Sequence, residues 1–248
     1  AFKRGNVTWP IGKGADVIDP EPVDMLQPVT VGSLDSQKVA AIILEALEFA
    51  KRAIDAQLEE LGRLDAVAGD GDHGIGMQRG LAAAIAAARK ACEAGAGAGT
   101  LLTLSGDAWA ARAGGTSGAL WGVILCSLGQ QLGDTAAPDT KTVAAGVANA
   151  LREVMQRGKA KPGDKTLVDV LQPFSVAIDQ SAVNGISVAV AWKNAVTIAN
   201  DAAQETRNLL PKMGRARPHA EKSIGTPDPG AVSMALIITA VSDVINKH

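Results

Sequence analysis

Aromatic side chains are scarce in this chain of 248 residues. Tyr is absent, and three Phe and four Trp residues make up 3% of the sequence, although 47% of the residues are hydrophobic. Small residues are abundant, and 27 residues are Gly. Small side chains let helices approach one another closely, and Ala has the highest helix propensity. The composition therefore favours closely packed helices, and the length allows one sizeable core or two small ones.

An excess of charge, long apolar runs and cysteine are also lacking. A formal net charge of −2 provides no electrostatic footprint for nucleic acid or for an anionic membrane. No apolar run reaches bilayer-spanning length, and the amino terminus has no signal-peptide pattern. Cys92 and Cys126 match no metal or redox spacing, so we expect two buried thiols in a reducing compartment. These absences predict a cytoplasmic protein with no membrane span and no nucleic-acid partner.

The chain divides into an irregular arm, residues 1–33, and a helical domain, residues 34–248. Four Pro and four Gly residues interrupt any period in the arm, which is typical of a linker. From Ser36 onward apolar residues recur every three or four positions, and Ser33 or Asp35 can cap the first helix. We predict no strand and eight helices, over residues 36–61, 76–94, 100–113, 117–132, 140–158, 166–182, 187–208 and 229–247.

A glycine-rich turn carries the strongest chemical signal. Asp65, Asp70 and Asp72 lie within eight residues, and glycines flank the last two. Glycine relaxes the steric limits on the backbone, so the turn can aim its carboxylates at one point. Mg²⁺ and Ca²⁺ prefer oxygen ligands, and Mg²⁺ combines one or two carboxylates with substrate phosphates and water. The turn is therefore a candidate site for a hard cation.

The turn has three other interpretations. The letters G-D-G-D-H-G satisfy G-x-G-x-x-G, but the dinucleotide fingerprint follows a strand, whereas a helical pattern precedes this turn. A calcium-binding EF-hand loop needs Glu at its twelfth position, where this chain has Leu81 or Ala83. A solvated loop after a helix remains an alternative, because Gly and Asp are ordinary turn residues.

A second glycine-rich connection, Gly114-Gly115-Thr116-Ser117-Gly118, separates two predicted helices. It offers backbone amides and two hydroxyls at a helix start, where unpaired N–H groups and positive partial charge favour phosphate. The alternative is that Thr116 or Ser117 only caps the helix.

A basic loop precedes the last predicted helix. Arg215 has the forked donors that clamp phosphate, while Asp228 can cap the helix or approach a nucleotide; a positively charged loop is also commonly solvated. Residues 161–166 are similarly ambiguous between a phosphate loop and a structural turn. His73 can donate to phosphate as a neutral imidazole or make a local turn hydrogen bond. Together these loops at helix ends are the parts that phosphoryl transfer requires.

Four motifs in order resemble the nucleotide-binding L domain or L subunit of dihydroxyacetone kinases. They are L-D-A-x-x-G-D-G-D-H-G-x-x-M-x-R-G, G-G-T-S-G, R-G-K-A-K-P-G-D-K-T-L-x-D-V and G-R-A-x-x-x-x-E-K-S-I-G-x-x-D-P-G-A, and the match runs from about Ser36 to the carboxyl end. The resemblance implies an all-α fold, a barrel-like bundle of eight antiparallel helices that holds ADP or ATP at one end through two Mg²⁺ ions.

The resemblance also implies roles for single residues. Asp65, Asp70 and Asp72 match the metal-binding aspartates, and we expect them to act in catalysis with Arg215. The residues expected along the nucleotide are His73, Gly74, Ile75, Gly76, Thr116, Ser117, Gly158, Leu167, Arg215, Asp228, Pro229 and Gly230. The loop after Arg215 lacks the aromatic residue common in the family, which affects the expected loop shape.

In this family the ketose is held on a separate K domain or subunit, bound covalently to a histidine. The resemblance therefore implies half of an enzyme, which presents the phosphoryl donor to dihydroxyacetone or a related short ketose. Two alternatives remain open: an ADP-carrying shuttle subunit that a phosphotransferase-system protein rephosphorylates, and a non-enzymatic nucleotide-binding regulator. The arm, residues 1–33, has no counterpart in the minimal L subunit.

Overall fold

The computed structural model describes residues 29–214 and 216–248 of the chain. The described helices are α1 (Leu34–Ala56), α2 (Leu58–Ala66), α3 (His73–Glu93), α4 (Ala98–Ala113), α5 (Gly115–Leu132), α6 (Thr140–Gly158), α7 (Val168–Val183), α8 (Val188–Glu205) and α9 (Pro229–Ile245), with the 3-10 turns η1 (Thr206–Asn208) and η2 (Arg217–Ser223). Within these residues the β pairing is a single bridge between Val31 and Ala96. The predicted all-α fold is confirmed.

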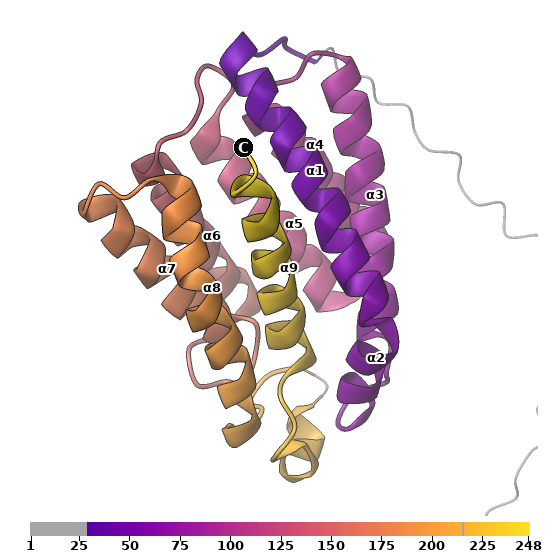
Figure 1. The fold of residues 1–248 in the computed structure, drawn as a ribbon. Helices are drawn as coiled ribbons and strands as arrows, with labels where there is room; N and C mark the ends of the chain where they lie inside the picture. Colours follow the sequence, from indigo (N-terminus) through magenta and orange to yellow (C-terminus); the bar gives the residue numbers. More distant parts are fainter. Residues whose placement is uncertain (1–28, 215) are drawn as a thin grey trace, which may run out of the picture.

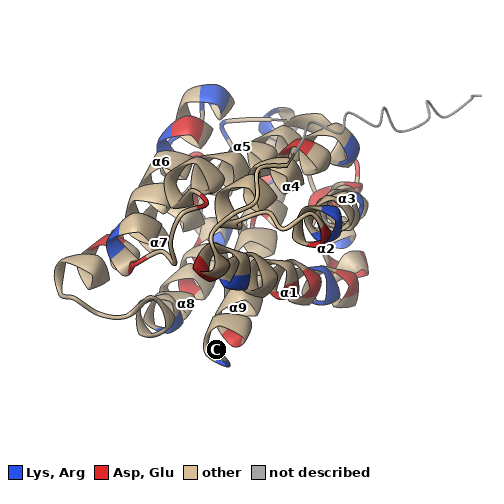
Figure 2. Cartoon of the chain, turned by 90° about the horizontal axis from the view of Figure 1, so that it is seen from above, with Lys and Arg blue, Asp and Glu red and all other residues tan. Residues whose placement is uncertain are grey.

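Within the described residues, eight of the nine α-helices, all except α2, form a closed ring (Figure 1). Around the ring each helix packs against two neighbours, in the order α1, α3, α4, α5, α6, α7, α8 and α9, and α9 packs against α1. Seen from above, the helices surround a common interior (Figure 2). The chain reverses between successive helices of the ring, so neighbours run antiparallel. The barrel of eight antiparallel helices is therefore present, and the short α2 lies outside the ring against α3.

The first predicted helix is two helices in the structure. The chain leaves helical geometry at Gln57, with φ −114° and ψ 15°, and α2 begins at the next residue. The apolar spacing runs across this break, since Ile54 of α1 and Leu61 of α2 are both fully buried, which is why the pattern predicted one element. Ser33 caps α1 as expected, because its hydroxyl accepts a hydrogen bond from the Ser36 amide at 3.1 Å.

Most of the predicted arm, residues 1–28, lies outside the described residues. Its last residues are tied to the ring: the Gly32 amide donates to the Gly95 carbonyl at 2.9 Å, and the Ser33 amide donates to the Asp134 carbonyl at 2.9 Å. The division of the chain near residue 33 therefore stays a prediction from sequence. The backbone is hydrogen-bonded to the ring from Gly32 onward.

Small residues set the closest helix contacts. A Cβ atom added to Gly106 of α4 would lie 2.8 Å from the Gly122 carbonyl oxygen of α5, so this crossing admits only glycine. Inside the ring is an apolar cavity of about 480 Å³. Its lining includes Trp109 and Trp121, whose rings stack with centroids 5.1 Å apart.

The two thiols are less buried than the sequence predicted. Cys92 and Cys126 are both half-buried and not disulfide-bonded. Cys126 lies on the flank of α5 that faces α4, where its thiol donates to the Thr103 carbonyl, rather than toward the ring interior. Burial raises the pKa of the Cys126 thiol to about 11. None of the helices in the described residues has both the length and the apolar character needed to span a bilayer.

The up-and-down order places alternate connections at the same end of the ring. The connections at residues 57–72, 114, 159–167 and 206–228 therefore meet at the end that carries α2 (Figure 1). The connections at residues 94–97, 133–139 and 184–187 lie at the opposite end, with the start of α1 and the end of α9. All four motifs singled out in the sequence thus lie at or beside one end.

Candidate metal and nucleotide site

The acidic turn gathers three carboxylates between α2 and α3. Asp65 lies in the last turn of α2, and Asp72 is the residue that precedes α3. One oxygen from each of Asp65, Asp70 and Asp72 lies within 4.8 Å of the others. The three aspartates, which are close in sequence, therefore form a cluster of hard oxygen donors.

Backbone amides orient the first carboxylate of the cluster. The Asp65 Oδ2 atom accepts from the Gly71 amide at 2.9 Å and from the His73 amide at 3.4 Å. Gly71 has φ +79°, the left-handed region that glycine adopts without strain. Asp72 precedes α3 but makes no capping hydrogen bond through its side chain. The three carboxylate oxygens of the cluster fit the ligand chemistry of Mg²⁺.

His73 joins the acidic turn to α9. Its ring is buried, and Nε2 lies 2.9 Å from the Ser233 hydroxyl, which in turn donates to the Gly230 carbonyl at 3.0 Å. Burial lowers the pKa of the His73 imidazole, while the negative charge of Asp65 acts in the opposite direction. The ring thus makes a contact between helices rather than a local turn hydrogen bond. The sequence offered one indirect signal for Ser233, a serine on a strongly apolar helix.

The start of α9 lies beside the start of α7. The Asp228 carboxylate accepts from the Ala231 amide at 2.8 Å and so caps α9. A Cβ added to Gly230 would lie 3.0 Å from Asp228 Oδ2 and 3.7 Å from the Leu167 amide nitrogen. Desolvation raises the pKa of the Asp228 carboxyl to about 7, against the hydrogen bond from Ala231, which lowers it. Asp228, Gly230 and Leu167 are therefore brought together, with Pro229 as the first residue of α9.

The glycine-rich connection before α5 is open. Gly114 and Gly115 have φ +69° and +61°, and an added Cβ at either would meet no atom within 4 Å. Helix α5 has no side-chain capping bond, so capping by Thr116 or Ser117 is wrong as an explanation of these hydroxyls. Thr116 is exposed and Ser117 is half-buried in the first turn of α5.

The remaining predicted residues lie at the same end of the ring. Gly74 is buried, and Ile75 (44% exposed) and Gly76 follow it in the first turn of α3. Gly158 ends α6 beside Leu120 of α5. Arg215 lies outside the described residues, so its placement stays a prediction. Of the predicted metal-binding and nucleotide-binding residues that the structure describes, none lines the apolar cavity of the ring.

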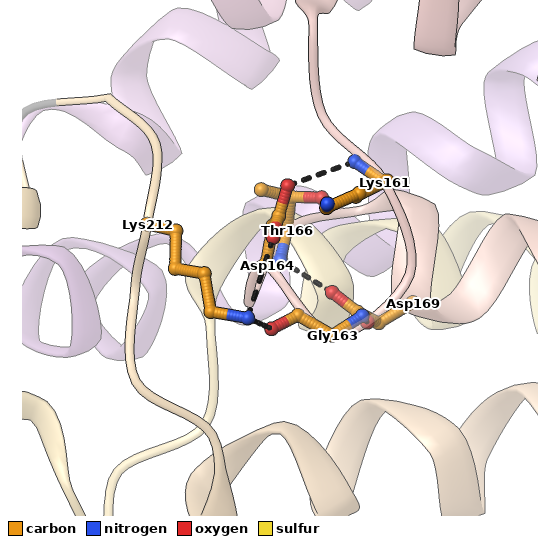
Figure 3. Close-up of polar contacts among 6 residues, drawn as sticks. All are labelled: Lys161, Gly163, Asp164, Thr166, Asp169 and Lys212. Carbon is orange, nitrogen blue, oxygen red and sulfur yellow. Dashed lines mark hydrogen bonds and ion pairs between the residues drawn. The ribbon is translucent and has the colours of Figure 1, made fainter.

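The connection between α6 and α7 is a self-bonded turn (Figure 3). The Asp169 carboxylate accepts from the Thr166 amide at 2.7 Å, and Asp164 Oδ2 accepts from the Lys161 amide at 3.0 Å. Lys165 is buried in this turn, and its amine reaches Ser223 of the connection before α9. Sequence reasoning did not single out Lys165, because a lysine between Asp and Thr is an ordinary surface pattern.

Comparisons with known proteins identify the family of the chain. The DAK2 domain family model matches residues 67–243. Over 247 residues the chain is 50% identical to an L-erythrulose kinase from Pectobacterium atrosepticum, a match that covers 100% of this chain and 41% of that kinase. The chain therefore spans about two fifths of the length of that relative.

A shorter relative is matched over most of its length. The chain is 34% identical over 180 residues to the PEP-dependent dihydroxyacetone kinase, ADP-binding subunit DhaL, from Escherichia coli, which covers 73% of this chain and 85% of that subunit. Among solved structures, the dihydroxyacetone kinase of C. freundii in complex with AMP-PNP and Mg²⁺ has the same fold. The TM-score is 0.61 at 20% identity, over 98% of this chain and 38% of that one.

Proposed function

Because this chain belongs to the DAK2 domain family, we propose that it is the nucleotide-binding part of a kinase that phosphorylates a short ketose such as erythrulose or dihydroxyacetone. One observation carries the proposal: the oxygens of Asp65, Asp70 and Asp72 converge within 4.8 Å at the end of the ring where the phosphate-friendly connections meet. The similarity to a subunit named as ADP-binding supports the same conclusion.

The three aspartates would hold two Mg²⁺ ions, which when bound would offset the charge of the nucleotide phosphates. The first amides of a helix lack helical partners, and in α3 the amides of Gly74 and Ile75 would face the phosphates beside the turn. Thr116 and Ser117 would supply hydroxyls from the start of α5, and Arg215 a charged clamp. Gly158 and Leu167 would border the base. Catalysis of this kind rests on positioning and charge, and this chain needs no general base of its own.

The ketose would be held by a separate domain or subunit. The chain spans about two fifths of the L-erythrulose kinase, which leaves room in such a protein for a ketose-binding domain. We place the pair in the cytoplasm, in keeping with two cysteines that form no disulfide.

Calorimetry and a turnover assay test this function. The chain should bind ADP in the presence of Mg²⁺ and lose that binding when EDTA removes the cation. With ATP and erythrulose or dihydroxyacetone it should form no sugar phosphate alone and should form it when a ketose-binding partner is added. Binding of ADP that ignores Mg²⁺, or turnover by the chain alone, would contradict the proposal.

A second function is favoured by the match to 85% of the DhaL subunit. In this version the chain keeps its ADP and a phosphotransferase-system protein rephosphorylates it. Turnover that requires phosphoenolpyruvate and such a donor, with no response to added ATP, selects the shuttle. Turnover with ATP alone selects the kinase domain, and nucleotide binding without turnover under either condition selects a regulator.

A further inference from the structure

The connection between η1 and α9 is held at two points by one turn. We call residues 209–228 the closing segment, because it leads to Asp228 and the start of α9. The Lys212 amine donates to the Gly163 carbonyl at 3.1 Å (Figure 3). The Lys212 amide donates to the Asp164 carbonyl at 3.1 Å. The closing segment is therefore fixed near its beginning to the turn between α6 and α7.

The next residue of that turn holds the other part of the segment. The Lys165 amine donates to the Ser223 carbonyl at 2.6 Å and approaches the Ser223 hydroxyl at 3.1 Å. Lys165 is 4% exposed and Ser223 is 5% exposed, so this contact is shielded from water. Lys165 also adopts a left-handed backbone with φ +59°, which costs a non-glycine residue energy and persists only where its surroundings hold it there.

Asp164 has the same buried character. Its side chain is 4% exposed and faces the largely exposed Lys212 amine, with 3.6 Å between that nitrogen and Asp164 Oδ1. Two neighbouring side chains of opposite charge thus reach two points of the closing segment, 11 residues apart in sequence. Because buried charges are costly unless they are paired, this arrangement has to be maintained by a specific contact.

The closing segment continues directly into the proposed nucleotide site. Asp228 caps α9, and the first turns of α9 contact His73 through Ser233. The Lys165 charge also acts on the Asp228 carboxyl, since its positive charge opposes the rise in the pKa of Asp228. The closing segment therefore connects Ser223 along the chain to the start of α9, which in turn contacts His73 beside the acidic turn.

We propose that Lys165 is a positioning residue for nucleotide binding: it clasps the closing segment through Ser223 and so fixes the start of α9 beside the acidic turn. This inference rests on the proposed function, because it concerns the same site. Lys165 acts through the segment and is assigned no contact with the nucleotide.

The matched control for Lys165 is Lys159. It lies in the same connection and also has a left-handed backbone, with φ +57°, but its side chain is exposed. Both Lys165→Met and Lys159→Met remove one charge at a residue with a left-handed backbone. Only Lys165→Met also removes the contact with Ser223.

Hydrogen exchange and calorimetry test the clasp. In the ligand-free chain, Lys165→Met should accelerate amide exchange in residues 212–223 at least tenfold and leave exchange in α1 to α5 unchanged. It should also raise the Kd for ADP with Mg²⁺ at least tenfold, whereas Lys159→Met should change neither. Unchanged exchange in Lys165→Met overturns the clasp, and faster exchange with wild-type affinity overturns the positioning role.

Two possible results, absent ADP binding and a variant that does not fold, need separate measurements. If the wild-type chain binds no ADP, the proposed function fails, while the exchange measurement still decides whether the clasp exists. If Lys165→Met does not fold, Lys212→Met removes the side-chain contacts at the other point of the segment, from an exposed position, and leaves the bond from the Lys212 amide to the Asp164 carbonyl. Faster exchange in residues 212–223 together with weaker ADP binding in Lys212→Met supports the proposal, and faster exchange with wild-type affinity overturns the positioning role.

Discussion

Asp228 combines a helix cap with a carboxyl that the protein keeps from water. The cap stabilises α9 through the Ala231 amide, while desolvation penalises the ionised form and raises the pKa to about 7. An unfolded chain would titrate the same group near its ordinary value of 3.8. Between these values the folded state binds more protons than the unfolded state, so this group lowers stability as the pH rises.

The pH dependence of stability should therefore change in Asp228→Asn. Asn remains a good cap but does not titrate. Between about pH 4 and pH 7 the wild-type free energy of unfolding should fall relative to the variant, by at most about 1.4 kcal/mol per pH unit. Urea unfolding of both proteins at several pH values measures the difference, in which the His73 contribution cancels. Parallel profiles would show that the carboxyl is not desolvated as described.

Asp72→Asn should abolish Mg²⁺-dependent ADP binding, because a neutral amide is a poor substitute for a carboxylate at a divalent cation. We expect the Kd to rise by at least 100-fold, about 2.8 kcal/mol, with unchanged helix content. Calorimetry and circular dichroism check the two parts. Asp179→Asn, at an exposed position on α7, serves as the control. Wild-type affinity in Asp72→Asn would make the acidic turn structural.

At the scale of helices, the crossing of α4 and α5 depends on glycine. In Gly106→Ala the new methyl would lie 2.8 Å from both the Gly122 carbonyl oxygen and the Cys126 sulfur, so the helices must separate. We expect a loss of about 1–3 kcal/mol in urea unfolding. The control Gly146→Ala meets the flexible end of Leu128 at 3.1 Å and gains helix propensity. It should be neutral or stabilising, and equal losses in both variants would refute the packing argument.

Helix periodicity predicted nearly all of these elements, since most helices place one apolar face toward the ring. Helix periodicity did not predict the break between α1 and α2. Leu58 and Leu61 continue the apolar spacing of α1, so the pattern shows no gap at Gln57. Helix α3 begins at His73, three residues before the predicted start, because glycines at positions 74 and 76 mask a helical turn in sequence.

Only part of the candidate site could be predicted from the sequence. The acidic cluster could be predicted because its members are close in sequence and glycine permits the turn. The contact between His73 and Ser233 joins residues 160 positions apart, and the contact between Lys165 and Ser223 spans 58. Such contacts depend on which helices become neighbours in the ring, and local patterns carry no record of that. The role assigned to Arg215 remains a prediction.

At the scale of the whole molecule, the ring closes within the described residues, and this leads to a truncation experiment. Deleting residues 1–28 should leave the melting temperature and ADP affinity nearly unchanged. Deleting residues 1–33 should cost about 1–2 kcal/mol, because it removes the Ser33 cap and the bonds from Gly32 and Ser33. Calorimetric melting compares the two. A drop of more than about 8 °C after the shorter deletion would show that residues 1–28 contribute to the core.

Because the ring contains an even number of antiparallel helices, the chain enters and leaves it at the same end. The start of α1 and the end of α9 lie at the same end of the ring, and the acidic turn lies at the other. Helix α1 has 23 residues and is therefore about 34 Å long. A domain tethered ahead of α1 could present its ketose to the acidic turn only if its tether ran back along the barrel, over about ten extended residues or more. A subunit that associates freely has no such requirement, so the length of the tether sets which architectures can carry out the transfer within one polypeptide.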